Sequence, residues 1–181
     1  MSQNKLLNIR LLAMDVDGVL TKGEITYSDS GDELKVFNIH DGLGLAVCKH
    51  AGLITAVITG RTSTAIQRRA EELGINDLYQ KVRDKAVAIR SLMKKHNIDQ
   101  NQIAFIGDDI NDIPAFRMSG LSIAVNNASV DLKQCADHIT GSNGGEGAVR
   151  EVIEMILRAQ GKWDSAVELF LNDLETSECR Q

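Results

Sequence analysis

Hydrophobic residues come in short continuous runs, separated by longer segments with helical periodicity. Four runs have the length of a strand and are rich in β-branched residues: 9–14, 53–59, 103–107 and 121–125. Continuous runs, unlike alternating ones, are typical of strands buried on both faces of a parallel sheet. We therefore predict that these four runs are neighbouring strands of one parallel sheet covered by helices.

The segments between the runs carry helix signals. Thr62 or Ser63 is a suitable N-cap for a helix that extends to residue 73 and stops at Gly74. Asp84 is a suitable cap for a second helix, through residue 96. A third helix is predicted over 148–160, where apolar residues form one stripe that ends before Gly161.

This alternation of strand and helix predicts an α/β fold with a mainly parallel sheet between two helical layers, and 181 residues suit a single domain. Residues 23–39 depart from the pattern: they read as two short strands around the turn 28–32, a small hairpin inserted after the first strand. The segment 162–181 has apolar residues at helical spacing and then turns polar, which fits a docking helix or a mobile end.

Composition narrows the classes of function. With 43% hydrophobic and 25% charged residues the chain is typical of globular proteins, and a net charge of −5 argues against a nucleic-acid partner. No run approaches the roughly 20 apolar residues of a membrane span, and the first residues lack a signal-peptide pattern, so we expect a cytoplasmic protein without a membrane partner. The cysteines have neither disulfide nor zinc spacing and are expected to be reduced: Cys48, Cys135 and Cys179.

Two acidic clusters follow predicted strands. Asp15 and Asp17 come directly after the first run, and residues two apart in an extended chain face the same side. Asp108, Asp109 and Asp112 follow the third run. Because ligands of open α/β sheets bind outside the carboxyl ends of the strands, the two clusters are expected to meet there and to bind a hard divalent cation such as Mg²⁺.

Two further elements suit a phosphate. Thr59 and Gly60 end the second run just before a predicted helix, where a hydroxyl and backbone N–H groups can hold phosphoryl oxygens. Lys85 begins another predicted helix, and its ammonium can neutralise a phosphoryl oxygen. Each element alone has an ordinary structural explanation, as a turn, a helix cap or a solvated side chain. Their joint occurrence at strand ends favours phosphoryl chemistry.

These residues resemble the haloacid dehalogenase superfamily of phosphotransferases, whose four motifs appear in order at Asp15–Val19, Thr59, Lys85 and Gly107–Asp112. Over residues 8–162 the chain is similar to the 3-deoxy-D-manno-octulosonate 8-phosphate (KDO 8-phosphate) phosphatases of that superfamily. The similarity rests on "DVDGVLT", "GEITYSDSGDELKVFNIHDGLG", "ITGR", "GDDINDIPAF", "GGEGAVREV" and "AQGK". It implies a capless three-layer Rossmann-like fold, a Mg²⁺ cofactor, a homotetramer and a part in lipopolysaccharide precursor synthesis.

The resemblance also implies a role for each motif residue. Asp15 is the expected nucleophile, which forms an aspartyl phosphate, and Asp17 the expected general acid and base. Thr59 and Lys85 are expected to hold the phosphoryl group. Mg²⁺ is expected to bind the Asp15 carboxylate, the backbone carbonyl of Asp17 and the carboxylate of Asp108. The remaining acidic residues are expected to position Lys85 or metal-bound water: Asp109 and Asp112.

For the acidic keto-sugar, the resemblance points to Asn38, Asp41, Gly60, Arg61 and Arg69, besides Thr59 and Lys85. A guanidinium suits the sugar carboxylate because it can bind both oxygens. An ion pair with a neighbouring acidic residue explains two of the chain's arginines nearly as well: Arg69 with Glu72, and Arg150 with Glu146 or Glu154.

The chain departs from the family at His40, Ala46 and Glu146, where members often carry basic residues. Glu146 is also found in phosphatases of nine-carbon keto-acid sugars, whereas Arg61 favours the eight-carbon substrate. The nine-carbon sugar 9-phosphate is therefore the alternative substrate.

Two other classes of function compete with a phosphatase. A phosphoacceptor signalling domain also gathers Asp, Thr and Lys at strand ends, but its adjacent acidic pair and middle-strand phosphorylated Asp differ from the order found here. A catalytically idle oligomerisation module is the other alternative, against which the filled catalytic positions argue. Apolar residues on the lone hairpin favour burial by partner subunits: Ile25, Tyr27, Leu34, Val36 and Phe37. The tail from Trp163 is a candidate cover for a neighbour's site.

Overall fold

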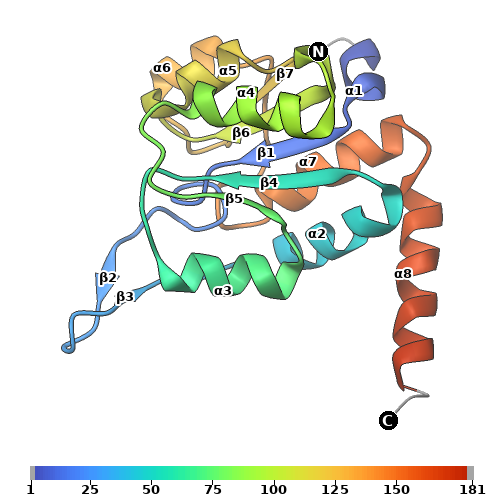
Figure 1. Ribbon diagram of the computed structural model, residues 1–181, viewed down its shortest axis with the longest axis horizontal. Coiled ribbons are helices and arrows are strands. Elements are labelled where there is room, and N and C mark those ends of the chain that lie inside the picture. Colours follow the sequence, from blue (N-terminus) through green and yellow to red (C-terminus); the bar gives the residue numbers. More distant parts are fainter. Residues whose placement is uncertain (1–2, 179–181) are drawn as a thin grey trace.

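A six-stranded sheet, parallel throughout, forms the centre of the computed structural model, which describes residues 3–178 (Figure 1). The strand order is β5-β4-β1-β6-β7-β8. The strands are β1 (Leu11–Met14), β4 (Ile54–Ile58), β5 (Asp77–Tyr79), β6 (Ile103–Gly107), β7 (Leu121–Ala124) and β8 (His138–Ile139). All four predicted strands are confirmed, and β5 and β8 are two short edge strands that the hydrophobic pattern did not reveal.

The order of the strands makes β1 the switch point of the sheet. Leu11 lies opposite Ile54 on β4 and Ile103 on β6. The chain builds the sheet outward from β1 through β4 and β5, and then returns to the other side of β1 for β6, β7 and β8. Such a reversal leaves a crevice at the carboxyl end of the central strand, where α/β proteins bind ligands.

Helices cover both faces of the sheet (Figure 1). One face carries α2 (Ile39–Ala51), α3 (Thr64–Leu73) and α7 (Ala148–Ala159), and the other carries α4 (Lys85–His96), α5 (Ile113–Arg117) and α6 (Val130–Cys135). The short helix α1 (Gln3–Asn8) packs against α7, and two 3₁₀ turns, η1 (Gln100–Gln102) and η2 (Ile110–Asp112), flank β6. The predicted three-layer α/β architecture is confirmed.

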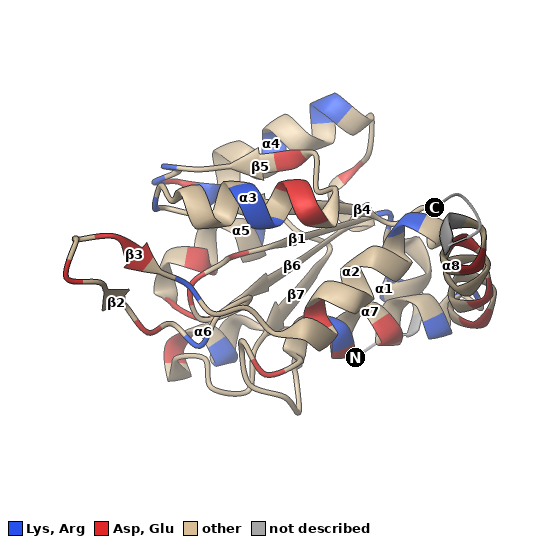
Figure 2. Ribbon diagram, turned by 90° about the horizontal axis from the view of Figure 1, so that it is seen from below, with Lys and Arg blue, Asp and Glu red and all other residues tan. Residues whose placement is uncertain are grey.

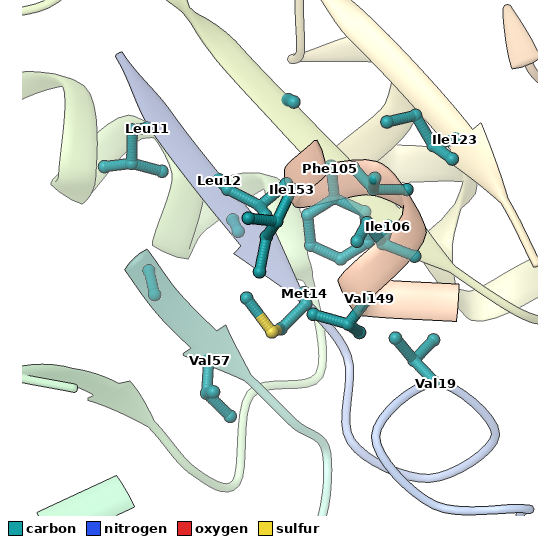
Figure 3. Close-up of a cluster of buried hydrophobic side chains, with 14 of the residues drawn as sticks. Leu11, Leu12, Met14, Val19, Val57, Phe105, Ile106, Ile123, Val149 and Ile153 are labelled. Atoms are coloured by element: carbon teal, nitrogen blue, oxygen red, sulfur yellow. The ribbon is translucent and has the colours of Figure 1, made fainter. Parts of the chain in front are cut away.

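The core lies between these layers and is centred on β1 and β6 (Figure 3). Met14, Phe105 and Ile106 are completely buried, as are Val149 and Ile153 of α7. Phe105 points to the opposite face of the sheet from its neighbour Ile106 and packs edge-on against Phe116 of α5. Burial of each such side chain contributes about 1.5–3 kcal/mol. This packing holds the end of β1 in a fixed place relative to β6.

The predicted helix ends are close to those found. Helix α3 follows Ser63 and ends at Gly74, whose φ of +63° is the left-handed value that glycine adopts readily. Asp84 caps α4 by accepting the backbone N–H of Ala86 at 3.0 Å. Helix α2 was not predicted, because Gly42 and Gly44 lower its intrinsic helix propensity.

The hairpin consists of two antiparallel two-residue strands, β2 (Thr26–Tyr27) and β3 (Glu33–Leu34), and it projects from the body of the molecule (Figures 1 and 2). Four of the five predicted apolar side chains are exposed in the monomer, including Val36 at 82% and Tyr27 at 62%, whereas Phe37 is partly buried against the core. The turn is held by the Ser28 carbonyl, which accepts the N–H of Gly31 at 2.9 Å.

The C-terminal segment forms α8 (Trp163–Glu178), which lies against α2 of the same chain (Figure 1). Trp163 is buried, and the guanidinium groups of Arg150 and Arg158 lie 4.8 and 5.2 Å from the centre of its ring. Of the two predictions for this segment, a docking helix or a mobile end, the structure shows the docking helix as far as residue 178.

Burial raises the pKa of the Cys48 thiol to about 12, which makes it an inert packing group. Cys135 is exposed and free, and Cys179 lies outside the described residues. In residues 3–178 no helix is both long and apolar enough to cross a bilayer.

Candidate active site

The carboxyl ends of the three central strands bring the predicted phosphoryl residues together. Asp15 directly follows β1, Thr59 directly follows β4, and Asp108 directly follows β6. Lys85 reaches the same place from the first residue of α4. Asp15 and Asp108 are more than ninety positions apart in the sequence, and the parallel sheet brings them together.

Asp15, Lys85 and Asp112 form a buried ion triad. The ammonium of Lys85 lies 2.6 Å from Oδ2 of Asp15 and 2.5 Å from Oδ1 of Asp112. Lys85 is 1% exposed and Asp15 is 5% exposed. Burial lowers the pKa of Lys85, but the two carboxylates outweigh it and raise that pKa, so the lysine is charged. It is therefore held by charge on both sides rather than solvated at a helix start.

Asp108 completes an acidic cluster beside this triad. One carboxylate oxygen from each of Asp15, Asp108 and Asp112 lies within 4.8 Å of the others. Burial, followed by the charges of Asp15 and Asp112, raises the pKa of Asp108 to about 7, and burial also raises the pKa of Asp15. Lys85 alone thus leaves excess negative charge among oxygen donors, which fits a hard divalent cation such as Mg²⁺.

The oxygens of Asp112 are already engaged within the protein. Oδ1 accepts from Lys85, and Oδ2 accepts the backbone N–H of Asp108 at 2.9 Å. Asp15 is engaged in a similar way, by Lys85 and the N–H of Val16, so partners alone do not separate the three carboxylates, and ligation of a metal by Asp15 and Asp108 stays a prediction. Asp109 is exposed and accepts the N–H of Ile110 at the start of η2, so its carboxylate serves as a local cap.

Gly18 is required by the closeness of Asp108. Its φ of +84° lies in the left-handed region, and a Cβ at this position would be 2.0 Å from Oδ2 of Asp108. The loop 141–147 supports the same turn from behind: the N–H of Gly145 donates to the carbonyl of Val19 at 2.8 Å, and a Cβ on Gly144 would be 1.7 Å from the carbonyl oxygen of Gly18. The loop after β1 is thus packed from two sides.

Asp17 has a different environment from Asp15. Its side chain is 25% exposed, and Oδ1 accepts from the ammonium of Lys35, a residue of the hairpin. Lys35 also lies 3.2 Å from Glu33, and Glu33 accepts from Arg61 at 2.8 Å. Neither Lys35 nor Glu33 is predictable as a site residue from the sequence, because only the folded hairpin brings them to the site.

Thr59 and Gly60 form the turn that follows β4. Thr59 is 1% exposed, and its hydroxyl accepts the N–H of Arg61 at 3.2 Å. Gly60 is exposed. The side chain of Arg61 is 41% exposed and lies between Glu33 and Asp17, at the rim of the site.

Asn38 and Asp41 are placed by the start of α2. Asn38 caps this helix by accepting the N–H of His40 at 2.8 Å, and its amide donates to the carbonyl of Gly145. Asp41 is 1% exposed and accepts the N–H of Arg150 at 2.8 Å, at the start of α7. The other oxygen, Oδ2, is buried without a hydrogen-bond partner among the described residues, and a contact between this carboxylate and the sugar stays a prediction.

The remaining candidate arginines have partners within the chain. Arg69 lies 3.2 Å from Glu72, as in the competing interpretation, and its guanidinium also lies 5.9 Å from the centre of the Phe37 ring. Arg150 pairs with Glu154 at 2.6 Å rather than with Glu146. Glu146 pairs with Lys22 at 2.6 Å on the surface. A sugar contact by Arg69 stays a prediction.

Known proteins that are similar in sequence to this chain belong to one group of hydrolases. A family model of haloacid dehalogenase-like hydrolases matches residues 74–153. The KDO 8-phosphate phosphatase of Haemophilus influenzae is 42% identical over 160 residues, which cover 88% of this chain and 89% of the relative. The phosphatase of the same name from Escherichia coli K12 is 44% identical over 162 residues, 90% of this chain and 86% of the relative.

Solved structures agree with these relatives. The KDO 8-phosphate phosphatase of Moraxella catarrhalis, in complex with a magnesium ion, a phosphate ion and KDO, is 45% identical with a TM-score of 0.89. The match covers 93% of this chain and 97% of the Moraxella catarrhalis chain. The enzyme from Yersinia pestis is 42% identical with a TM-score of 0.88, over 90% of this chain and 88% of that chain.

Proposed function

The chain belongs to the KDO 8-phosphate phosphatase family of the haloacid dehalogenase-like hydrolases, and on that premise we propose that it hydrolyses KDO 8-phosphate to the free sugar acid and phosphate. The observation that carries the proposal is the buried Asp15 at the end of the central strand, held by Lys85 and adjacent to Asp108. We also propose that the enzyme acts in lipopolysaccharide precursor synthesis, because that process uses this substrate.

Asp15 is the proposed nucleophile. Its Oδ1 accepts the N–H of Val16 at 2.7 Å and its Oδ2 lies 2.6 Å from Lys85, so both oxygens are fixed in direction. Attack on phosphorus forms an aspartyl phosphate and releases the sugar hydroxyl, which replaces one difficult displacement by two easier ones. Water then hydrolyses the aspartyl phosphate and restores the carboxylate.

Asp17 is the proposed general acid and base. It lies two residues after the nucleophile and is more exposed than Asp15, which suits a group that exchanges protons with substrate and water. It donates a proton to the leaving sugar oxygen in the first step and accepts one from the attacking water in the second.

The acidic cluster is the proposed Mg²⁺ site, with Asp15, Asp108 and the backbone carbonyl of Asp17 as ligands. When bound, Mg²⁺ supplies positive charge that screens the carboxylates from the phosphate dianion. Lys85, Thr59 and Gly60 are the groups of this chain that we assign to the phosphoryl oxygens, because an ammonium, a hydroxyl and backbone N–H groups stabilise the charge of the transition state.

For the sugar, Arg61 is the supported candidate among the arginines, because it lies at the rim beside Asp17 and remains partly exposed. Asn38 and Arg69 are proposed as further contacts. The nine-carbon sugar 9-phosphate remains the second candidate substrate, and the position of Glu146 is the observation that favours it.

A homotetramer in the cytoplasm is part of the proposal. The exposed apolar side chains of the hairpin support assembly, since a monomer would leave them in water and the site open. A cytoplasmic location is supported by the substrate class, because a phosphorylated sugar acid is too highly charged to enter a bilayer unaided.

The deciding experiment measures phosphate release from KDO 8-phosphate, nine-carbon sugar 9-phosphates and neutral sugar phosphates, with and without Mg²⁺. We expect the highest kcat/KM for KDO 8-phosphate, loss of activity with EDTA, and loss of activity in Asp15→Asn. Equal kcat/KM values for all sugars would overturn the substrate and retain the chemistry. Unchanged turnover by Asp15→Asn would overturn the mechanism.

A further inference from the structure

The side chain of Lys35 is buried on a hairpin whose apolar side chains at the neighbouring positions are exposed. The hairpin strand β3 and its flanking residues are largely open to solvent, with Leu34 52% exposed and Val36 82% exposed. The Lys35 side chain between them is only 1% exposed. Lysine is almost never buried so fully unless it is paired, so its environment requires an explanation.

The partners of Lys35 form a closed ring of four alternating charges. Its ammonium donates to Oδ1 of Asp17 and to Oε1 of Glu33, the latter at 3.2 Å. The same oxygen of Glu33 accepts from Nη2 of Arg61 at 2.8 Å. Nε of Arg61 lies 3.8 Å from Oδ2 of Asp17 and closes the ring. Each charge has an opposite charge on either side.

The ring joins three segments that are far apart in sequence. Asp17 belongs to the loop after β1, Lys35 and Glu33 to the hairpin, and Arg61 to the loop after β4. Two cations and two carboxylates leave no net charge, so the arrangement does not need a bound ion. Its geometric effect is to fix the direction of the Asp17 carboxylate.

We propose that Lys35 is a positioning residue for Asp17, delivered by the hairpin, as Lys85 fixes Asp15. The inference rests on the proposed role of Asp17 as general acid. With Oδ1 held by Lys35, Oδ2 takes up a proton from solvent, which gives the ring one positive charge, and passes that proton to the leaving oxygen. As that proton moves, the bond from phosphorus to the leaving oxygen breaks, its electron pair stays on that oxygen, and the bond from phosphorus to Asp15 forms.

This assignment differs measurably from direct binding of substrate by Lys35. A positioning residue for a general acid matters most when the leaving group is a poor one, because a good leaving group departs without a proton. A lysine that binds the phosphoryl group would affect all leaving groups equally. The dependence of kcat/KM on leaving-group pKa therefore separates the two roles, since kcat/KM reports the steps up to formation of the aspartyl phosphate.

The test compares wild type with Lys35→Met on a series of substituted phenyl phosphates, at saturating Mg²⁺. We expect kcat/KM to fall about tenfold or more for phenyl phosphate, whose leaving phenol has a pKa of about 10, and less than about threefold for 4-nitrophenyl phosphate. Lys22→Met, which removes an exposed lysine that pairs with Glu146, is the matched control and should leave the leaving-group dependence unchanged.

A second variant covers the case in which Lys35→Met does not fold. Glu33→Gln keeps the shape of the ring and removes the charge between Lys35 and Arg61. We expect kcat/KM to depend more steeply on leaving-group pKa than in the wild type, but less steeply than in Lys35→Met. Parallel losses across the series in the folded variant would overturn the positioning role. Activity of the wild type that does not depend on Asp15 would instead overturn the proposed function, so the two failures are distinguishable.

Discussion

The ammonium of Lys85 lies 2.5 Å from Oδ1 of Asp112, a carboxylate whose other oxygen accepts the backbone N–H of Asp108 at 2.9 Å. Asp112 therefore fixes both the cation of the site and the start of the loop that carries a proposed metal ligand. It is completely buried and supports the site without being exposed to substrate.

Substitution Asp112→Ala should be costly for stability and activity. It leaves Lys85 with one carboxylate and the Asp108 N–H without its acceptor, and breaking a buried ion pair costs about 3–5 kcal/mol. We expect urea unfolding to show a loss of this size and phosphate release to become very slow. Asp109→Ala removes only an exposed cap and should lower the free energy of unfolding by about 1 kcal/mol. Equal losses in Asp109→Ala and Asp112→Ala would contradict the role of Asp112.

Substitution Gly18→Ala should abolish Mg²⁺ binding, because the new Cβ would occupy the place of the Asp108 carboxylate. Isothermal titration with Mg²⁺ measures this directly. Gly31→Ala is the matched control: its φ of +87° imposes similar backbone strain, but nothing lies within 4 Å of the added Cβ. Mg²⁺ affinity should be unchanged in Gly31→Ala, and a normal affinity in Gly18→Ala would show that Asp108 is not a ligand.

Mg²⁺ affinity should fall as the pH is lowered through about 7, because the pKa of Asp108 is raised to about 7 and a protonated carboxyl must lose its proton to bind the metal. Calorimetry in buffers of different ionisation enthalpy should detect proton release on binding. If Asp108→Asn releases as many protons as the wild type when Mg²⁺ binds, the protons come from another group.

The same shift makes an opposite prediction for the metal-free protein. Between about pH 4, the ordinary range of the carboxyl, and about pH 7, folded Asp108 holds a proton that the unfolded chain has lost. Its contribution to the free energy of unfolding therefore falls as pH rises through this window, and Mg²⁺ should restore it. Urea unfolding with EDTA, compared with Asp108→Asn, measures the contribution.

Substitution Trp163→Ala should detach the start of α8. Trp163 is 7% exposed and lies against two guanidinium groups, and loss of such a side chain costs about 3–5 kcal/mol. Leu171→Ala, at a position 51% exposed on the same helix, should change the free energy of unfolding by less than about 0.5 kcal/mol. Similar losses at both positions would mean that α8 is not anchored at Trp163.

Substitution Val36→Asp should disrupt the proposed tetramer, because it places a charge at the most exposed apolar position of the hairpin. Sedimentation velocity should show smaller species than the wild type. Val130→Asp is the control, since Val130 is 71% exposed at the start of α6, far from the hairpin in sequence, and Asp is favourable in a first helical turn. An unchanged mass for Val36→Asp would exclude the hairpin from the interface.

The sequence predicted the features that depend on local pattern or on strand ends. The four apolar runs are strands, Gly74 ends α3, and the residues placed after β1, β4 and β6 meet at one edge of the sheet. These predictions succeed because a parallel sheet turns positions after strands into neighbours in space.

Features that depend on contacts between distant residues were not predicted from the sequence. Helix α2 contains two glycines that local propensity disfavours, yet a Cβ on Gly44 would lie 2.9 Å from Cδ of Arg150 and 3.4 Å from its Cα, so close packing against α7 favours the small residue. The contact between Asp41 and the start of α7 joins residues 109 positions apart, which the sequence does not reveal. Lys35 lies in a polar hairpin where only the fold reveals which lysine is buried.

The packing of Gly144 and Gly145 against the loop after β1 also has a consequence for synthesis of the chain. The backing of that loop is encoded about 125 residues after Val19, which takes roughly 6–25 seconds to translate at typical rates. During that interval the loop after β1 lacks the packing that Gly144 and Gly145 provide in the finished fold. The native packing of the loop that follows Asp15 is therefore complete only after the last third of the chain has begun to be synthesised.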